Sequence, residues 1–209
     1  GRKMSKSLGN VISPQEVIDK YGAEILRIWV SSEDYKDDIR ISQEILNRIV
    51  DAYRRVRNTF KYMLGVLGDF DPRNDYQPYD KLSNLDKAML YKLHHLNQKV
   101  QNAYENYDFH QVFHAIHGFC IVELSSLYLD VLKDRTYVLN KNDVKRRDSQ
   151  TVVFEICKNL ALLLSPILTF TCDEVWEHLN LENKKESIIL ESFSTLPEIM
   201  YNDEIAKKF

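Results

Sequence analysis

The sequence predicts an all-α protein built as an antiparallel helical bundle. Only six glycines and five prolines occur in 209 residues, too few for the many turns that an all-β chain needs. Long stretches instead repeat apolar residues every three or four positions, which is the spacing of one helical face. A serine or an aspartate precedes several of these stretches, at the place where an N-cap residue is expected. Together these observations indicate helices joined by polar loops.

The chain opens with a loop over residues 1–12, and the first helix follows it. In Ser13-Pro14-Gln15-Glu16, a serine at the N-cap, a proline at N1 and a glutamate at N3 form a capping box. We expect this helix to pause at Gly22 and to resume over residues 23–30. Residues 31–40, SSEDYKDDIR, then form a polar connector.

Five further helices are expected along the rest of the chain. Their predicted ranges are 43–68 after Ser42, 84–106 after Ser83, 109–133 after Asp108, 149–164, and 169–179. Gln111 is placed to complete the cap at Asp108, and Tyr107 and Val112 to form a hydrophobic staple. The charged residues 133–148 are expected to form an exposed excursion. We divide the chain into a leading region (1–42), a helical bundle (43–180) and a C-terminal extension (181–209).

Composition narrows the class of protein. The chain is 44% hydrophobic and 28% charged, as soluble globular proteins are. Its apolar runs fall far short of the roughly 20 residues of a membrane-spanning helix, and no secretory signal is seen at the start. Three separated cysteines among apolar residues read as reduced core thiols. We therefore expect a cytoplasmic monomer with no membrane partner.

The first candidate motif is Lys3-Met4-Ser5-Lys6-Ser7. Two ammonium groups three residues apart, with two hydroxyls and a following Gly9, would suit a loop that embraces a polyphosphate. Lysine carries a compact charge on a flexible stem that can follow charge as it develops. The alternative is a solvated polar terminus that happens to hold two lysines.

The second candidate lies on the polar face of the helix predicted over 43–68. Arg54, Arg57 and Lys61 fall on one arc of that helix, with Asn58 beside them and Arg55 further round. The chain as a whole has a net charge of −3, so such a basic stripe is a candidate surface for contacts with nucleic-acid phosphates. The alternative is an ordinary solvated helix face.

The third candidate is a row of histidines, His110, His114 and His117, with Cys120 one turn on. This spacing puts them on one side of a helix, where they could in principle bind zinc. They also lie at the edge of a buried arc, where histidines that form ordinary hydrogen bonds are far more common, and we predict no metal site. Trp176 and Phe170 are interpreted as core residues. No complete catalytic constellation follows from the spacing of residues.

Several stretches carry a family resemblance. Residues 3–42, KMSKSLGNVISPQEVIDKYGAEILRIWVSSEDYKDDIRIS, resemble the end of the catalytic domain of class I aminoacyl-tRNA synthetases, and specifically of the isoleucyl-tRNA synthetase family. The stretches AYRRVRNTFKYML (52–64), YDFHQVFHAIHGFC (107–120), YLDVLKDRTY (128–137) and SPILTFTCDEVWEHL (165–179) resemble the family's helical anticodon-binding domain. Beyond residue 180 the resemblance is loose.

The resemblance implies roles for particular residues. Lys3 to Ser7 would be the KMSKS loop, whose second lysine, Lys6, stabilises the phosphates of ATP, used with Mg. Residues 13–42 would be the connecting, stem-contact region, and the bundle would bind the anticodon arm of isoleucine tRNA. Residues implied as contacts to the tRNA backbone are Arg54, Arg57, Asn58 and Lys61, with Arg40 and Arg55 as secondary candidates.

The resemblance also shows what is missing. A whole family member has an upstream nucleotide-binding fold with the HIGH signature and an editing domain, and bacterial members usually carry a C-terminal zinc module. None of these is in the sequence, so we interpret it as an excised fragment that catalyses nothing alone, binds no cofactor, and has the parent's zinc outside it. A valyl-type parent, or a stand-alone RNA-binding helical module, is the alternative.

Overall fold

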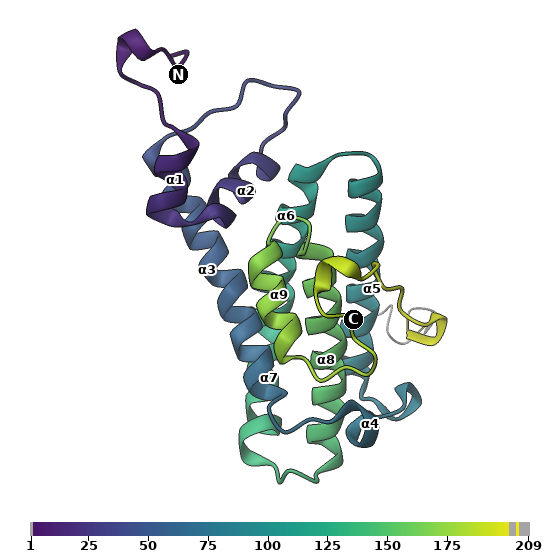
Figure 1. Ribbon diagram of the computed structural model, residues 1–209. Helices are drawn as coiled ribbons and strands as arrows, with labels where there is room; N and C mark the ends of the chain where they lie inside the picture. Colours follow the sequence, from purple (N-terminus) through teal and green to yellow (C-terminus); the bar gives the residue numbers. More distant parts are fainter. Residues whose placement is uncertain (1, 201–203, 205–209) are drawn as a thin grey trace.

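The computed structural model describes residues 2–200 and residue 204, and within these residues it contains helices and turns but no β-strand. The all-α prediction is confirmed. Figure 1 shows two parts, a leading arm (residues 2–41) at the top and a bundle of long helices below it.

The leading arm holds one short 3-10 turn and two short helices. The turn is Lys6–Leu8, α1 is Pro14–Tyr21 and α2 is Ala23–Ser32. The Ser13 hydroxyl accepts a hydrogen bond from the Glu16 N–H at 3.2 Å, as the predicted N-cap. Gly22 lies between the two helices with a φ of +91°, a backbone conformation that residues other than glycine rarely adopt. The expected pause at Gly22 is confirmed.

The bundle is formed by long helices that run antiparallel (Figure 1). Their bounds are α3 Gln43–Val66, α5 Asn84–Glu105, α6 Phe109–Gly118, α8 Val144–Leu164 and α9 Thr169–His178. The hydroxyls of Ser42 and Ser83 accept hydrogen bonds from backbone N–H groups in the first turns of α3 and α5, as predicted. The loop after α3 carries the single-turn helix α4, Pro72–Asp75, and a 3-10 turn at Tyr79–Lys81.

The core of the bundle surrounds α8, which is buried along nearly its whole length. Val56, Phe60 and Met63 supply the buried face of α3 at the spacing that the sequence predicted. Burying one such side chain completely contributes about 1.5–3 kcal/mol to folding. Trp176, on α9, is buried as expected, but Phe170 is 66% exposed, so its interpretation as a core residue is wrong.

The helix predicted over 109–133 is longer than expected. After α6 the chain continues through π-helical turns at Phe119–Tyr128, through α7 (Leu129–Lys133), and through further π-helical turns at Asp134–Val138. By length and composition the run Phe109–Val138 is apolar enough to cross a membrane. In the structure its positions Val112, Ile116 and Leu124 are completely buried in the bundle.

The predicted start of this helix is only partly correct. Phe109 is the first residue of α6, but the Asp108 side chain makes no capping hydrogen bond to the backbone. Tyr107 does not take the role of a staple residue, because it is 66% exposed and its ring lies edge to face against Phe109. Tyr107 has a φ of +58°, the left-handed conformation that often ends a helix.

The charged segment 133–148 is only in part the exposed excursion that we expected. Tyr137 and Val138 are 71% and 76% exposed, but the end of the segment is helical and turned inward. Helix α8 begins at Val144, five residues earlier than predicted, with Asp143 as its N-cap. Arg146 and Arg147 turn inward, and their side chains are only 14% and 11% exposed. Arg146 Nη2 lies 2.8 Å from Asp69 Oδ1, and Arg147 Nε lies 3.3 Å from Asp75 Oδ1. The charges are buried because carboxylates from the loop after α3 pair with them.

The tail packs on the bundle. Residues 181–200 contain 3-10 turns at Ile188–Leu190 and Glu198–Met200. Ile188, Leu196 and Met200 are buried. Lys184 Nζ donates hydrogen bonds to the last carbonyls of α9, those of Trp176 and Glu177 and that of Leu179, which is a favourable place for a cation.

The arm is fixed to the bundle by a set of polar contacts that we call the clasp, formed by Glu24, Arg27, Pro166, Ile167 and Thr171. The buried Glu24 carboxylate accepts hydrogen bonds from the N–H of Thr171, at 2.9 Å, and from its hydroxyl. Arg27 donates to the carbonyls of Pro166 and Ile167 at 2.6 and 2.8 Å. Because Thr171 lies in the first turn of α9, the clasp joins α2 to one end of that helix.

Candidate nucleic-acid interface

The lysine- and serine-rich loop lies at the far end of the arm (Figure 1). Lys3, Met4, Lys6 and Ser7 are exposed, and Ser5 is half-buried. The hydroxyls of Ser5 and Ser7 lie 2.7 Å apart. The loop therefore presents two ammonium groups and two hydroxyls, which are donors that suit a phosphate.

Asn10 closes this loop, and sequence reasoning missed its role. Its Oδ1 accepts from the Ser5 N–H at 2.8 Å, and its Nδ2 donates to the Lys3 carbonyl at 3.2 Å. Gly9 has a φ of +62° and returns the chain toward α1. The available signal was an Asn one residue after a Gly, since Asn side chains often bond to nearby backbone groups in turns.

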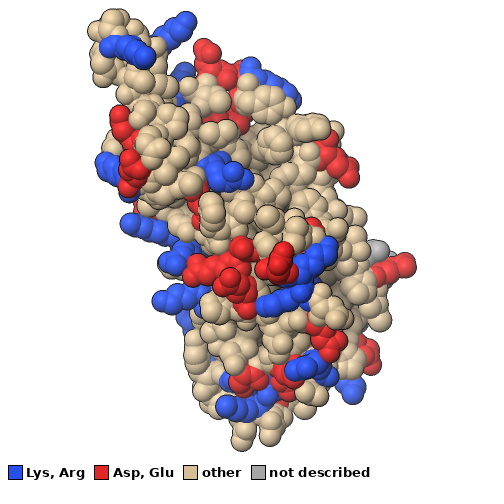
Figure 2. Space-filling view, in the orientation of Figure 1, with Lys and Arg blue, Asp and Glu red and all other residues tan. Residues whose placement is uncertain are grey.

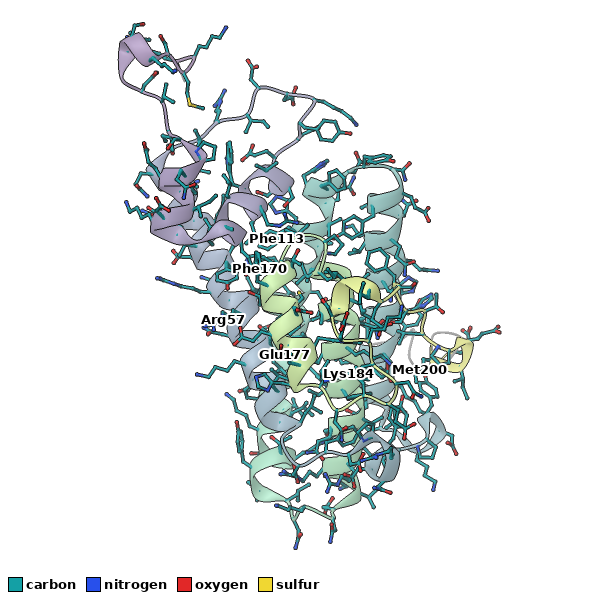
Figure 3. The ribbon with its side chains drawn as sticks, in the orientation of Figure 1. Arg57, Phe113, Phe170, Glu177, Lys184 and Met200 are labelled. Atoms are coloured by element: carbon teal, nitrogen blue, oxygen red, sulfur yellow. The ribbon has the colours of Figure 1, made fainter. Side chains whose placement is uncertain are left out.

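The predicted basic stripe lies on the solvent side of α3. Arg54, Arg57, Asn58 and Lys61 are all exposed. In Figure 2, blue side chains follow the edge of the molecule along α3, and Figure 3 labels Arg57 on α3, at the side that faces α9. The exposure predicted from the helical spacing is therefore present.

The structure does not gather these residues into one flat patch. Arg57 and Lys61 lie on the side toward α9, where they line a cavity of about 670 Å³ together with Glu174. Asn58 and Arg55 lie on the other side of α3, where they line a hollow of about 390 Å³ with Lys133. The cationic face of α3 is thus a ridge with a depression on each side.

The ion pairs on this ridge are weak. Arg54 Nη1 lies 3.7 Å from Asp51 Oδ1, with both side chains about 70% exposed. Arg57 Nη2 lies 4.0 Å from Glu174 Oε2, also in solvent. Exposed pairs of this kind contribute about 0–1 kcal/mol. No ion pair is described for Lys61, within the part of the chain that the structure covers. These cations are therefore available to an incoming anion.

Arg40 lies apart from this ridge, in the connector before α3. Its side chain is exposed, and its carbonyl accepts a hydrogen bond from the Trp29 indole at 3.1 Å. The two secondary candidates, Arg40 and Arg55, are thus placed on different elements.

The histidine row divides between solvent and the bundle. His110 is half-buried and His114 is exposed, whereas the ring of His117 stacks on Phe113 with centroids 5.8 Å apart. Burial lowers the pKa of His117, and the neighbouring Arg55 charge lowers it further. Among the residues that the structure describes, no group of three His, Cys, Asp or Glu side chains is arranged to hold a metal ion.

Two family models match the chain. The model described as the anticodon-binding domain of tRNA ligase matches residues 86–209, and that of class I tRNA synthetases (I, L, M and V) matches residues 1–42. The chain belongs to the family of tRNA ligases that carry this anticodon-binding domain. The basic residues of α3 lie between the two matched ranges, so these matches do not test their role.

Several curated relatives that are 43–52% identical to the chain are isoleucine–tRNA ligases. One from Geobacter sulfurreducens is 51% identical over 95% of this chain, and one from Petrotoga mobilis is 47% identical over the whole of it. The chain spans about a fifth of the length of these relatives, 21% and 23%. The resemblance to isoleucyl-tRNA synthetases is confirmed, and the relatives described here give no support to a valyl-type alternative.

A solved structure confirms the fold. The crystal structure of the ternary complex of Agrobacterium radiobacter K84 agnB2 LeuRS with tRNA and LeuAMS matches with a TM-score of 0.70. The match covers 96% of this chain and 23% of that one, at 21% sequence identity. A likeness at this identity shows the architecture alone.

Proposed function

We propose that the chain is the tRNA-binding part of an isoleucine–tRNA ligase and that α3 contacts the RNA backbone. The observation that carries this proposal is the exposed row of Arg54, Arg57 and Lys61 in a chain whose net charge is −3. Cations that are held weakly by their neighbours can exchange those neighbours for phosphates. The proposed contact with the RNA backbone also includes Asn58. Secondary candidates for this contact are Arg55, on the same helix, and Arg40, in the connector before it.

The loop at the start of the chain is proposed to act on ATP. Lys6 would neutralise charge on the phosphates, with Lys3, Ser5 and Ser7 as further donors, and Asn10 would keep the loop closed. The chemistry of these donors fits a polyphosphate accompanied by Mg. In the whole protein, ATP would activate isoleucine as the adenylate, which is then transferred to isoleucine tRNA.

The remaining expectations complete the proposal. The protein acts as a cytoplasmic monomer without a membrane partner, and any zinc of the whole enzyme is bound outside this chain. The chain alone is expected to catalyse neither step, because it spans about a fifth of the length of the isoleucine–tRNA ligases that it matches. Measurable ATP–pyrophosphate exchange by this polypeptide would contradict that statement.

The backbone contact is tested by salt dependence. A labelled isoleucine tRNA transcript is titrated with the wild type, Arg54→Ala and Arg57→Ala between about 50 and 200 mM salt. Each substitution should lower the slope of log affinity against log salt by about 1. Arg73→Ala is the matched control, because Arg73 is an exposed arginine on α4, paired with Asp71. Unchanged slopes for both α3 variants would refute the proposed interface.

A further inference from the structure

The cavity beside α3 has two cations on one wall and one carboxylate on the other. Arg57 and Lys61 line it from α3, while the Glu174 carboxylate lines it from α9, where the uncharged or cationic ring of His178 is also part of the wall. Figure 2 shows a group of red side chains over α9, directly beside the blue edge formed by α3. The exposed side of α9 also carries Glu177, three residues after Glu174, and Figure 3 labels Glu177 on that helix.

Neither carboxylate is needed to hold the fold. Both Glu174 and Glu177 are exposed, and the only ion pair described for either is that of Glu174 with Arg57, at 4.0 Å. The buried side of α9 is supplied by Thr171, Cys172 and Val175. Because other residues pack α9 against the bundle, the carboxylates of Glu174 and Glu177 can interact with a molecule that binds beside this helix.

We propose that Glu174 is a specificity-determining residue of the RNA-binding surface, and this rests on the proposed function. Its carboxylate draws the Arg57 guanidinium toward α9 and repels phosphates from that side of the cavity. An RNA backbone is then restricted to the outer side of α3. A tRNA whose shape fits the surface contacts the outer side of α3 and avoids Glu174. RNA without a fixed shape would also bind across α9, and the Glu174 charge weakens that mode of binding.

The test compares two RNAs. Affinities of the wild type and of Glu174→Gln are measured for an isoleucine tRNA transcript and for poly(U) of the same length. Removing the charge should tighten poly(U) binding by about 2- to 5-fold, the effect of one exposed ion pair, and tRNA binding by less. The difference should shrink as salt rises, because the Debye length falls from about 10 Å at 0.1 M to about 3 Å at 1 M. A change in packing would not follow salt in this way.

Two further variants complete the test. Glu105→Gln removes an exposed carboxylate at the end of α5, for which no ion pair is described, and should change neither affinity. In an Arg57→Ala background, Glu174→Gln should keep the part of its effect that comes from direct repulsion of phosphates and lose the part that comes from holding Arg57. Equal gains for tRNA and poly(U), or the same gain from Glu105→Gln, would overturn the role of Glu174. Failure of the wild type to bind tRNA would overturn the proposed function itself.

Discussion

The basic residues of α3 and those in the first turn of α8 are alike in sequence but opposite in surroundings. Arg54 and Arg57 have side chains that are 70% and 55% exposed, and their acidic neighbours are exposed as well. Arg146 and Arg147 are 14% and 11% exposed and are paired with Asp69 and Asp75. The first pair is available to a partner, and the second is already used by the fold. An arginine whose acidic neighbour is largely buried stabilises the fold, whereas one whose acidic neighbour is exposed can bind a partner, although the residue type is the same.

The largest effect should come from breaking a buried pair. Replacing Arg146 with alanine removes the positive charge that lies nearest to the Asp69 carboxylate, at 2.8 Å. The neutral amide of Gln150 and the more distant Arg147 guanidinium, at 3.6 Å, remain. We expect the free energy of unfolding to fall by about 2–4 kcal/mol. Urea unfolding of Arg146→Ala measures this loss, and a change below about 0.5 kcal/mol would show that the pair is not structural.

The same pair has a pH signature. Burial disfavours the charged form of Asp69, but hydrogen bonds from Arg146 and Gln150 outweigh that cost and lower the pKa of its carboxyl below 3.8. A lowered pKa gives stability that is present above the unfolded pKa and lost as pH falls through the folded one. Wild-type stability should therefore fall in acid more steeply than that of Arg146→Ala, as thermal melts between pH 7 and pH 3 would show.

A buried carboxylate without such a partner should behave in the opposite way. Asp148 is 7% exposed, and among residues 2–200 its Oδ1 finds no hydrogen-bond partner. Burial and the nearby Asp86 carboxylate raise the pKa of Asp148 to about 6. A carboxyl whose folded pKa is raised costs stability at neutral pH, and this cost disappears as pH falls through 6 toward 4.

Substituting Asp148 therefore sharpens the comparison. Asp148→Asn should raise the free energy of unfolding by about 1–2 kcal/mol at pH 7, with the gain fading below pH 6. Melting curves of wild type and variant at pH 7 and pH 5 measure it. A variant less stable than the wild type at both pH values would mean that the carboxylate has a partner after all.

The smallest effects on stability belong to the ridge of α3. Arg54→Ala and Arg57→Ala should each change the free energy of unfolding by less than about 0.5 kcal/mol, because their ion pairs are solvated. The same urea titrations measure this. A loss comparable to that of Arg146→Ala would erase the distinction between the two groups of arginines.

Much of the fold could be predicted because its signals are local. Ser13, Ser42 and Ser83 cap the helices that they were expected to cap, and the apolar spacing of α3 identified its buried face. The burial of Arg146 could not be predicted in this way, because its partner Asp69 is 77 residues away in the chain. The π-helical turns at Phe119–Tyr128 gave no signal either, since the spacing of apolar residues does not distinguish i→i+5 from i→i+4 hydrogen bonding.

In the candidate site, too, the local features could be predicted from the sequence and the contacts between helices could not. Helical spacing showed that Arg57 would be exposed, but not that α9 would bring Glu174 beside it. It also put Arg55 near the stripe without showing that Arg55 lies on the other side of α3. A periodic pattern reports which way a side chain points on its own helix, and the neighbouring helices decide what it meets.

The clasp changes what the connector between α2 and α3 has to do. Because Glu24 and Arg27 bind directly to the start of α9 and the turn before it, the exposed residues 35–40 are not the hinge that sets the direction of the arm. They serve as a tether, and a tether tolerates changes of length that a hinge does not. Adding glycines there should leave the arm seated, whereas removing both polar anchors in Glu24→Ala/Arg27→Ala should loosen it against the bundle, and spin-label distances between Leu8 and α3 would distinguish the two. Natural variation in length is therefore expected in the connector and not in the turn between α8 and α9.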